Sequence, residues 1–166
     1  MVHGGDNFMK IKKVLLALLL CAGLTLTGCT AKRKDDLVCT SFDTFYGVDQ
    51  EVTTTYENNG KRITKQTTIT VISSEDDEII EALAEEFAAY DFSKDFDYEG
   101  VTYDMKKVDN TFVETITIDF KTVSNSTLVE LGVLDSSDKD ADYIDVSLTR
   151  KNLESEGFVC KTVPIN

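Results

Sequence analysis

The chain has 166 residues, of which 30 are acidic and 17 are basic, and its formal net charge is −13. Such an acidic chain lacks the basic face that binding to nucleic acid phosphates requires, so we expect no nucleic acid partner. The length suits one compact domain behind a leader and is too short for two ordinary domains.

The first 28 residues have the form of a secretory signal peptide. Several lysines precede a short apolar run over residues 14–22, and this run is too short to span a bilayer permanently. It leads to Leu26-Thr27-Gly28-Cys29, which resembles the lipobox of bacterial lipoproteins, where small residues precede the cysteine that accepts a diacylglycerol. We therefore predict a signal peptide over residues 1–28 and lipidation of Cys29.

The lipid determines the expected location of the protein. Paired acyl chains such as palmitate hold a protein on a membrane nearly permanently, whereas one chain alone would be marginal. We expect Cys29 to anchor the protein in the cell membrane, with the domain on the extracytoplasmic face.

Residues 1–8 do not fit the head of a signal peptide, because Asp6 is acidic where cations are typical. Met9 is an ordinary start, and we predict that translation begins there. After Cys29 we expect a short polar tether over residues 29–36, although its basic residues 32–34 could instead meet acidic lipid headgroups. One globular domain should follow over residues 37–166.

Two cysteines remain for the domain, because Cys21 leaves with the signal peptide and Cys29 carries lipid. Cys39 and Cys160 lie near the two ends of the domain, and export places them outside the reducing cytosol. We predict a disulfide between them, with free buried thiols as the alternative.

The first half of the domain has the pattern of a β meander followed by a helix. A strand around residues 37–46 precedes an alternating, β-branched strand over 52–56, the turn 58–60 and a return strand over 63–71. From Ser74 the apolar residues recur at helical spacing as far as Tyr90, with Ser73 or Ser74 as the expected cap.

The second half alternates again. We predict strands over residues 101–105 and 112–120 around a turn at 109–110, and a short helix over 128–134. A last helix should begin at Ser147 and stop at Gly157, before a strand over residues 158–163. The expected fold class is α+β, an antiparallel sheet with the amphipathic helix and the C-terminal helix packed on one face.

Several kinds of chemistry are missing from the mature part of the chain. The sole histidine, His3, precedes the signal peptide, so neither a serine nor a cysteine nucleophile would have a histidine base. Glycine-rich phosphate loops are also absent from the sequence. We therefore expect neither an enzyme nor a bound cofactor.

One weak metal candidate is the acidic run at 138–142, where Asp138, Asp140 and Asp142 stand at alternate positions, as a calcium loop begins. The pattern then fails, because Tyr143 stands where glycine is needed and Thr149 where a bidentate glutamate is needed. A solvated acidic loop is the favoured interpretation, with no metal site.

A second candidate is the stretch from Tyr90 to Glu99, where aromatic and acidic residues alternate. Such a mixture can bind sugars, and paired carboxylates can hydrolyse them. The favoured interpretation is a connection between helix and strand, in which the aromatic residues cap the core and the acids stay in water.

The chain resembles the YehR-like lipoproteins over most of the mature domain. The resemblance rests on the lipobox and on short segments at 53–56, 60–61, 65–68, 115–119, 147–148 and 157–158. It implies a small α+β lipoprotein family of unknown function with no active-site residues to carry over. The segment Asp135 to Asp142 and the pair Cys39 and Cys160 are departures from the family pattern.

Three functions fit these observations. We favour a cell-envelope domain that binds an unknown protein or small ligand. A structural or accessory envelope lipoprotein without a small ligand comes second, and a carboxylate-based hydrolase comes last, because the catalytic motifs are missing.

Overall fold

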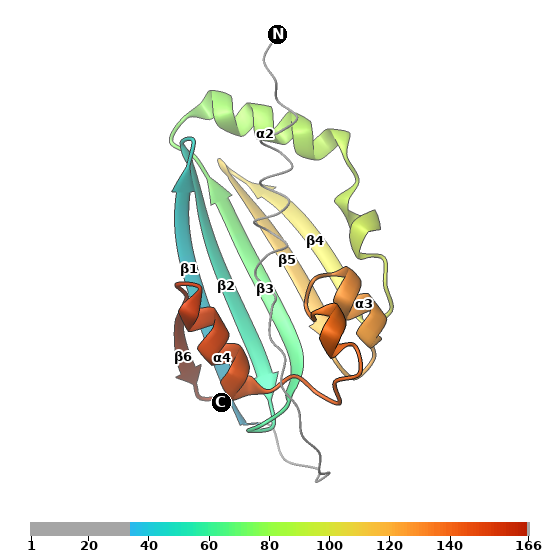
Figure 1. Ribbon diagram of the computed structural model, residues 1–166. Helices are drawn as coiled ribbons and strands as arrows, with labels where there is room; N and C mark the ends of the chain where they lie inside the picture. The colour runs from blue at the N-terminus through green and yellow to red at the C-terminus, as the bar shows by residue number, and fades with distance from the viewer. Residues whose placement is uncertain (1–33, 166) are drawn as a thin grey trace.

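The computed structural model describes residues 34–165, which form one antiparallel sheet with strand order β4-β5-β3-β2-β1-β6 (Figure 1). The strands are β1 (Lys34–Phe45), β2 (Val48–Asn58), β3 (Ile63–Ser73), β4 (Val101–Val108), β5 (Thr111–Asp119) and β6 (Val159–Val163). The helices are α2 (Asp77–Ala89), α3 (Asn125–Glu130) and α4 (Val146–Ser155), with the short 3-10 helices η1 (Phe92–Phe96) and η2 (Ser136–Asp138). The predictions for the signal peptide, Met9 and Cys29 lie outside the described residues.

Tight turns join neighbouring strands, two of them where the sequence predicted. At the β2–β3 turn, the Asn58 side chain accepts the Gly60 N–H at 2.8 Å and the Asn59 side chain accepts the Arg62 N–H at 2.9 Å. At the β4–β5 turn, Asp109 has a φ of 53°, in the left-handed region that aspartate tolerates better than most residues. The predicted turns at 58–60 and 109–110 are confirmed.

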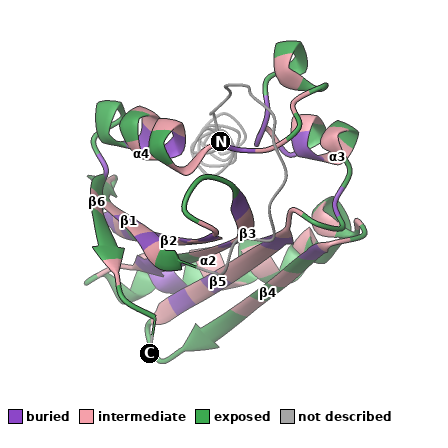
Figure 2. Ribbon diagram, turned by 90° about the horizontal axis from the view of Figure 1, so that it is seen from below, coloured by how far each residue is buried: buried purple, intermediate pink, exposed green. Residues whose placement is uncertain are grey.

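All the described helices pack against one face of the sheet, which we call the inner face. Figure 2 shows α3 and α4 above this face, and α2 packs across its far end through Val48, Ile72 and Phe112. The opposite, outer face carries mostly threonine, valine and charged side chains. This arrangement confirms the predicted α+β fold class. Within residues 34–165, the helices are too short or too polar to cross a membrane.

The inner face holds two separate apolar clusters. The large cluster lies under α3 and α4 and has a core from every strand but β6, together with the loops around α3 and α4: Leu37, Cys39, Val52, Tyr56, Ile63, Val101, Ile118, Val123, Leu128, Leu131, Val133, Leu134, Ile144, Leu153 and Phe158. The small cluster lies under α2 and has four buried members, Val48, Ile72, Ile80 and Phe112.

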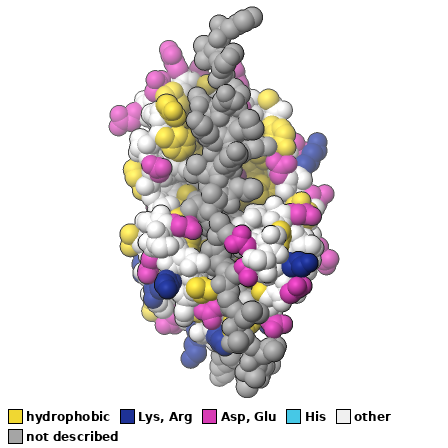
Figure 3. Space-filling view, in the orientation of Figure 1, with side chains coloured by type: hydrophobic (Ala, Val, Ile, Leu, Met, Phe, Trp, Pro, Cys, Tyr) yellow, Lys and Arg dark blue, Asp and Glu magenta, His cyan; other side chains and the backbone are white. Residues whose placement is uncertain are grey.

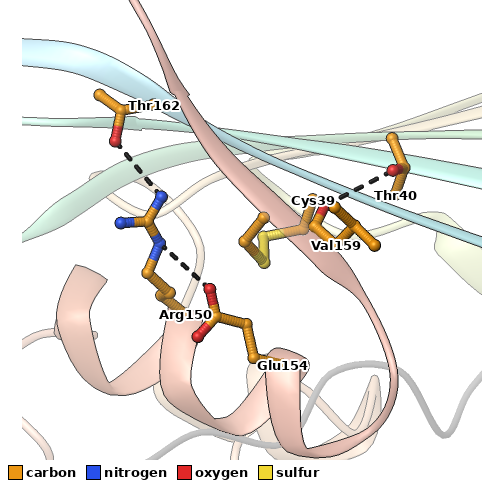
Figure 4. A network of polar contacts seen from close by, with 7 residues as sticks. Cys39, Thr40, Arg150, Glu154, Val159 and Thr162 are labelled. Atoms are coloured by element: carbon orange, nitrogen blue, oxygen red, sulfur yellow. Dashed lines mark hydrogen bonds and ion pairs between the residues drawn. A yellow bond between two sulfur atoms is a disulfide. The ribbon is translucent and has the colours of Figure 1, made fainter.

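The structure contains the disulfide that the sequence predicts, Cys39–Cys160, which joins β1 to β6 at directly paired positions. Figure 4 shows α4 beside this bond, with Arg150 bridging the helix and the strand. The Arg150 guanidinium contacts Glu154 at 3.6 Å and donates to the Thr162 hydroxyl at 3.4 Å. The disulfide therefore holds the C-terminal strand and its helix on the large cluster.

The helix boundaries differ from the prediction at three ends. Helix α2 is capped by Asp76, which accepts the Glu78 N–H at 2.9 Å. Ser74 lies two residues earlier, where its hydroxyl accepts the Asp76 N–H at 3.1 Å and donates to the Gly47 carbonyl. Helix α4 is capped by Asp145, whose carboxylate accepts the N–H groups of residues 147 and 148, so Ser147 lies inside the helix. Helix α3 ends at Glu130, before most of the range predicted for it.

The other end of α4 agrees with the prediction, because Gly157 follows it with a φ of 94°. At the N-terminal end of the domain, β1 begins at Lys34, inside the segment predicted as a tether. Pairing explains this extension, since Asp36 lies opposite Val163 and the Asn58 side chain donates to the Asp35 carbonyl at 3.0 Å.

Candidate functional site

Polar side chains are also buried on the inner face. Those of β2, β3 and β5 belong to neither cluster, and, apart from Asn58 at the end of β2, we call them the polar belt: Gln50, Thr54, Gln66, Thr70 and Glu114. Figure 1 shows α2 at one end of the sheet and α3 and α4 at the other. The belt lies among members of both clusters, since Gln66 pairs with Ile118 of the large cluster and Gln50 with Ile72 of the small one. Thr54 and Gln66 hydrogen-bond to Thr68, whereas a buried polar group without a partner costs free energy that apolar packing would avoid.

At the β5 side of the belt, Glu114 forms a pair with Tyr103 of the neighbouring strand β4. Glu114 on β5 lies opposite Thr70 and Met105 and is only 5% exposed. Tyr103 lies two residues before Met105 on β4, so the two side chains point to the same face of the sheet. The Tyr103 ring stacks on Phe96, with ring centroids 4.8 Å apart. Within residues 34–165, neither the Tyr103 hydroxyl nor Glu114 Oε2 completes a hydrogen bond.

The surroundings change the proton affinity of both groups. Burial raises the pKa of the Glu114 carboxyl, although the nearby hydroxyls of Tyr103 and Thr70 act in the opposite direction. Burial and then the Glu114 charge raise the pKa of the Tyr103 hydroxyl far above its ordinary value. Tyr103 is therefore a neutral donor at physiological pH, beside a carboxyl group that lacks its full set of hydrogen bonds.

Tyr103 also forms part of a groove of about 500 Å³ between α2, η1 and β4. Aromatic side chains form one part of its wall, with Phe87 of α2 meeting Phe112 edge to face at 4.8 Å and Phe92 at 5.8 Å. Polar side chains, including Asp91, Ser93 and Lys107, also line the groove. The groove thus combines an apolar wall with a few polar groups, as small-ligand sites do.

The segment from Tyr90 to Glu99 contains η1, and its aromatic side chains pack in two different places. Phe96 and Tyr98 pack against the large cluster, as the favoured interpretation of this segment predicted. Tyr90 and Phe92 instead line the groove. Its carboxylates bond to neighbouring hydroxyls, since Ser93 donates to Asp91 and Tyr90 donates to Asp95 at 2.8 Å. The Ser93 hydrogen bond lowers the pKa of the exposed Asp91.

The calcium candidate does not form a cation site in the structure. Among residues 34–165, no group of three carboxylate, cysteine or histidine side chains could hold a metal ion, and this includes Asp138, Asp140 and Asp142. The loop is held through its backbone, because Asn125 donates to the carbonyls of residues 139 and 141. On the face in Figure 3, acidic side chains are likewise scattered rather than gathered in one patch.

Neither Glu114 nor Tyr103 was predicted from the sequence to be a functional residue. A signal was present, because Glu114 occupies an inward position of an alternating strand, between Phe112 and Ile116. An acidic residue in that position costs free energy on burial, so it marks a place where something other than packing determines the residue. Its proximity to Tyr103 could not be predicted, because it depends on the pairing of β4 with β5.

Comparisons with known proteins identify the family but no activity. The family described as a protein of unknown function, DUF1307, matches residues 43–159. The NMR structure of E. coli YehR has a TM-score of 0.55 and 17% identity, covering 83% of this chain and 97% of YehR. An NMR structure of a protein from Streptococcus pneumoniae TIGR4 has a TM-score of 0.47 and 14% identity, covering 84% and 92% of the two chains.

The curated proteins contain no match to the chain. The likeness to YehR shows a shared fold, and the family match extends over most of the chain. The chain therefore belongs to the DUF1307 family of proteins of unknown function, and its domain is YehR-like, as the sequence predicted.

Proposed function

We propose that this protein is a lipid-anchored binding domain of the cell envelope, which holds a small ligand in the groove and does not transform it. The observation that carries this proposal is the Glu114–Tyr103 pair, in which the Tyr103 hydroxyl and Glu114 Oε2 have no hydrogen-bond partner among the described residues. Tyr103 lines the groove of about 500 Å³, and Glu114 lies behind it, opposite Met105, which also lines the groove. A buried polar group left without a partner is costly, by roughly 1–3 kcal/mol. A ligand that completes those hydrogen bonds would account for its presence.

The proposed anchor and the groove lie at opposite ends of the sheet. Cys29 shortly precedes β1, which begins opposite Asn58, while β1 ends opposite Val48, against which α2 packs. The 12 residues of β1 rise by about 3.3 Å each, so roughly 40 Å of strand separates the two ends. A lipid on Cys29 would thus leave the groove facing away from the membrane, accessible to a ligand in the envelope.

Ligand binding can be tested by blocking the groove from helix α2. Ala88 lines the groove and is exposed, so Ala88→Trp should fill it without disturbing the core. Ala82→Trp on the same helix is the matched control, because Ala82 is exposed and lies outside the groove. The assay is a saturation-transfer NMR screen of small aromatic fragments on the protein purified from membranes.

We expect fragments that bind the wild type and Ala82→Trp but fail to bind Ala88→Trp. A screen in which Ala88→Trp binds the same fragments as the wild type, or in which no fragment binds, would contradict the proposal. That result would favour the accessory role, in which the envelope lipoprotein has no small ligand.

The lipid anchor is tested separately by metabolic labelling with an alkyne analogue of palmitate. We expect label on the wild type and none on Cys29→Ala, which should accumulate as an uncleaved precursor. Label that persists on Cys29→Ala would overturn the proposed attachment of the lipid.

A further inference from the structure

We propose that the ligand of the groove carries an organic ammonium group, which binds at Glu114 and Tyr103 while its apolar part lies on the aromatic wall. This inference rests on the proposed function, because it names the ligand class of the same groove. It follows from the charge of Glu114, the nature of the wall and the position of Lys107.

Within residues 34–165, the groups that act on the Glu114 carboxyl include no cation. Glu114 is only 5% exposed, and the groups that act on its carboxylate within residues 34–165 are the neutral hydroxyls of Tyr103 and Thr70. A buried carboxylate without a counter-charge is strongly unfavourable, whereas a charge-assisted hydrogen bond is about twice as strong as a neutral one. An ammonium group supplies both the positive charge and N–H donors for Glu114 Oε2 and the Tyr103 oxygen.

The aromatic side chains in the wall of the groove also favour a cationic ligand. Aromatic rings attract cations over their faces, and sites for organic ammonium groups use such rings repeatedly. Here the chain already places an ammonium group of its own on the wall, since Lys107 Nζ lies 5.7 Å from the centre of the Phe112 ring. The same groove is lined by Phe87 and Phe92.

Other ligand charges fit less well. An anionic group at this position would meet the like charge of Glu114, and a neutral group would leave that charge without compensation. Lys107 lines the groove and would repel an ammonium ligand, so its removal should favour cations selectively.

Calorimetry with three matched probes tests the ligand charge. Phenethylamine, 2-phenylethanol and 3-phenylpropionate share a phenyl ring and differ in bearing a positive, a neutral or a negative group. We expect the purified protein to bind phenethylamine at least tenfold more tightly than the other two. Glu114→Gln should weaken binding of the amine about tenfold to a hundredfold, which corresponds to the loss of a charged hydrogen bond.

Two further variants distinguish the effect of charges in the groove from the effect of the total charge of the protein. Glu51→Gln makes the same substitution on the outer face of the same sheet, in β2, where the side chain is exposed, and should leave amine binding unchanged. Lys107→Met should strengthen amine binding several-fold and leave the alcohol within about twofold.

The outcomes distinguish this inference from the proposed function. If the alcohol binds as tightly as the amine and Ala88→Trp abolishes both, the groove is a ligand site and the ammonium inference is wrong. If amine binding survives in Glu114→Gln, the inference is also wrong. If no probe binds and the fragment screen finds nothing that Ala88→Trp removes, both proposals fail.

Discussion

The two ends of the inner face are built in different ways. At the α4 end, the large cluster, the disulfide and the bridge through Arg150 hold the helices on the sheet. At the α2 end, four buried residues support one helix, and much of the nearby surface belongs to the groove.

This difference suggests a division of roles within one sheet. Regions with few buried apolar contacts open locally at low cost, and binding sites are drawn from such regions. We expect the free energy of unfolding to depend mainly on the α4 end, while the α2 end is free to adapt to a ligand. The variants below test whether the two ends differ in this way.

The largest effect should come from removing the disulfide. The bond spans 121 residues, so the variant with both Cys39→Ala and Cys160→Ala should lose about 3–5 kcal/mol in the free energy of unfolding. Guanidinium denaturation measures this loss, and reducing the wild type should reproduce it. If the wild type keeps its stability under a reductant that breaks the bond, the α4 end does not depend on the cross-link.

A matched pair of core truncations compares the clusters directly. Ile118 in the large cluster is 1% exposed and Ile72 in the small cluster is 5% exposed, and both are inward residues of central strands. Ile118→Ala should cost about 3–4 kcal/mol and Ile72→Ala about 2 kcal/mol, since a cavity under a single helix can collapse more easily. Equal losses in denaturation would show that the two ends are packed equally well.

The two capping aspartates provide the next comparison. Asp145 accepts two backbone N–H groups at the start of α4, whereas Asp76 accepts one at the start of α2. Asp145→Ala should lower the global stability by about 1–2 kcal/mol, and Asp76→Ala by about 0.5 kcal/mol. Hydrogen exchange should show that Asp76→Ala increases exchange mainly within α2, and exchange spread evenly over the sheet would contradict this.

Local patterns predicted much of the fold. Alternation located β2 and β5, and the residues of the turns at Asn58 and Asp109 located two of the hairpins. Helix ends were predicted less well, because several capping residues compete within a few positions. Ser74 accepts the N–H of Asp76, which is itself the cap of α2, and donates to the Gly47 carbonyl, which belongs to a different part of the sequence.

The candidate site was harder to predict, because it depends on long-range contacts. The alternation placed Glu114 on the inner face, yet its neighbour Tyr103 is set by the register between β4 and β5. The groove needs α2, η1 and β4 together, and no local pattern indicates how a helix crosses the end of a sheet. The disulfide was predictable because only Cys39 and Cys160 lie in the domain predicted over residues 37–166.

The effect expected at Glu114 is about as small as that of a helix cap, and its sign distinguishes a binding residue from a stabilising one. Because burial raises its pKa above 4.5, the folded state holds a proton that the unfolded state releases as the pH rises from about that value. The wild type should therefore lose stability as the pH rises through the window that begins there, and the penalty should persist at neutral pH.

Glu114→Gln removes this titration. Its stability relative to the wild type should be close to zero at pH 4 and should increase with pH, to a gain of roughly 1 kcal/mol at pH 7, since a buried charge is replaced by a neutral amide. Thermal unfolding from pH 4 to pH 8 measures the difference, with the exposed Glu51→Gln as control. A variant less stable than the wild type at pH 7 would mean that Glu114 supports the fold. A more stable variant that no longer binds amine would show a residue kept for its ligand at the expense of stability.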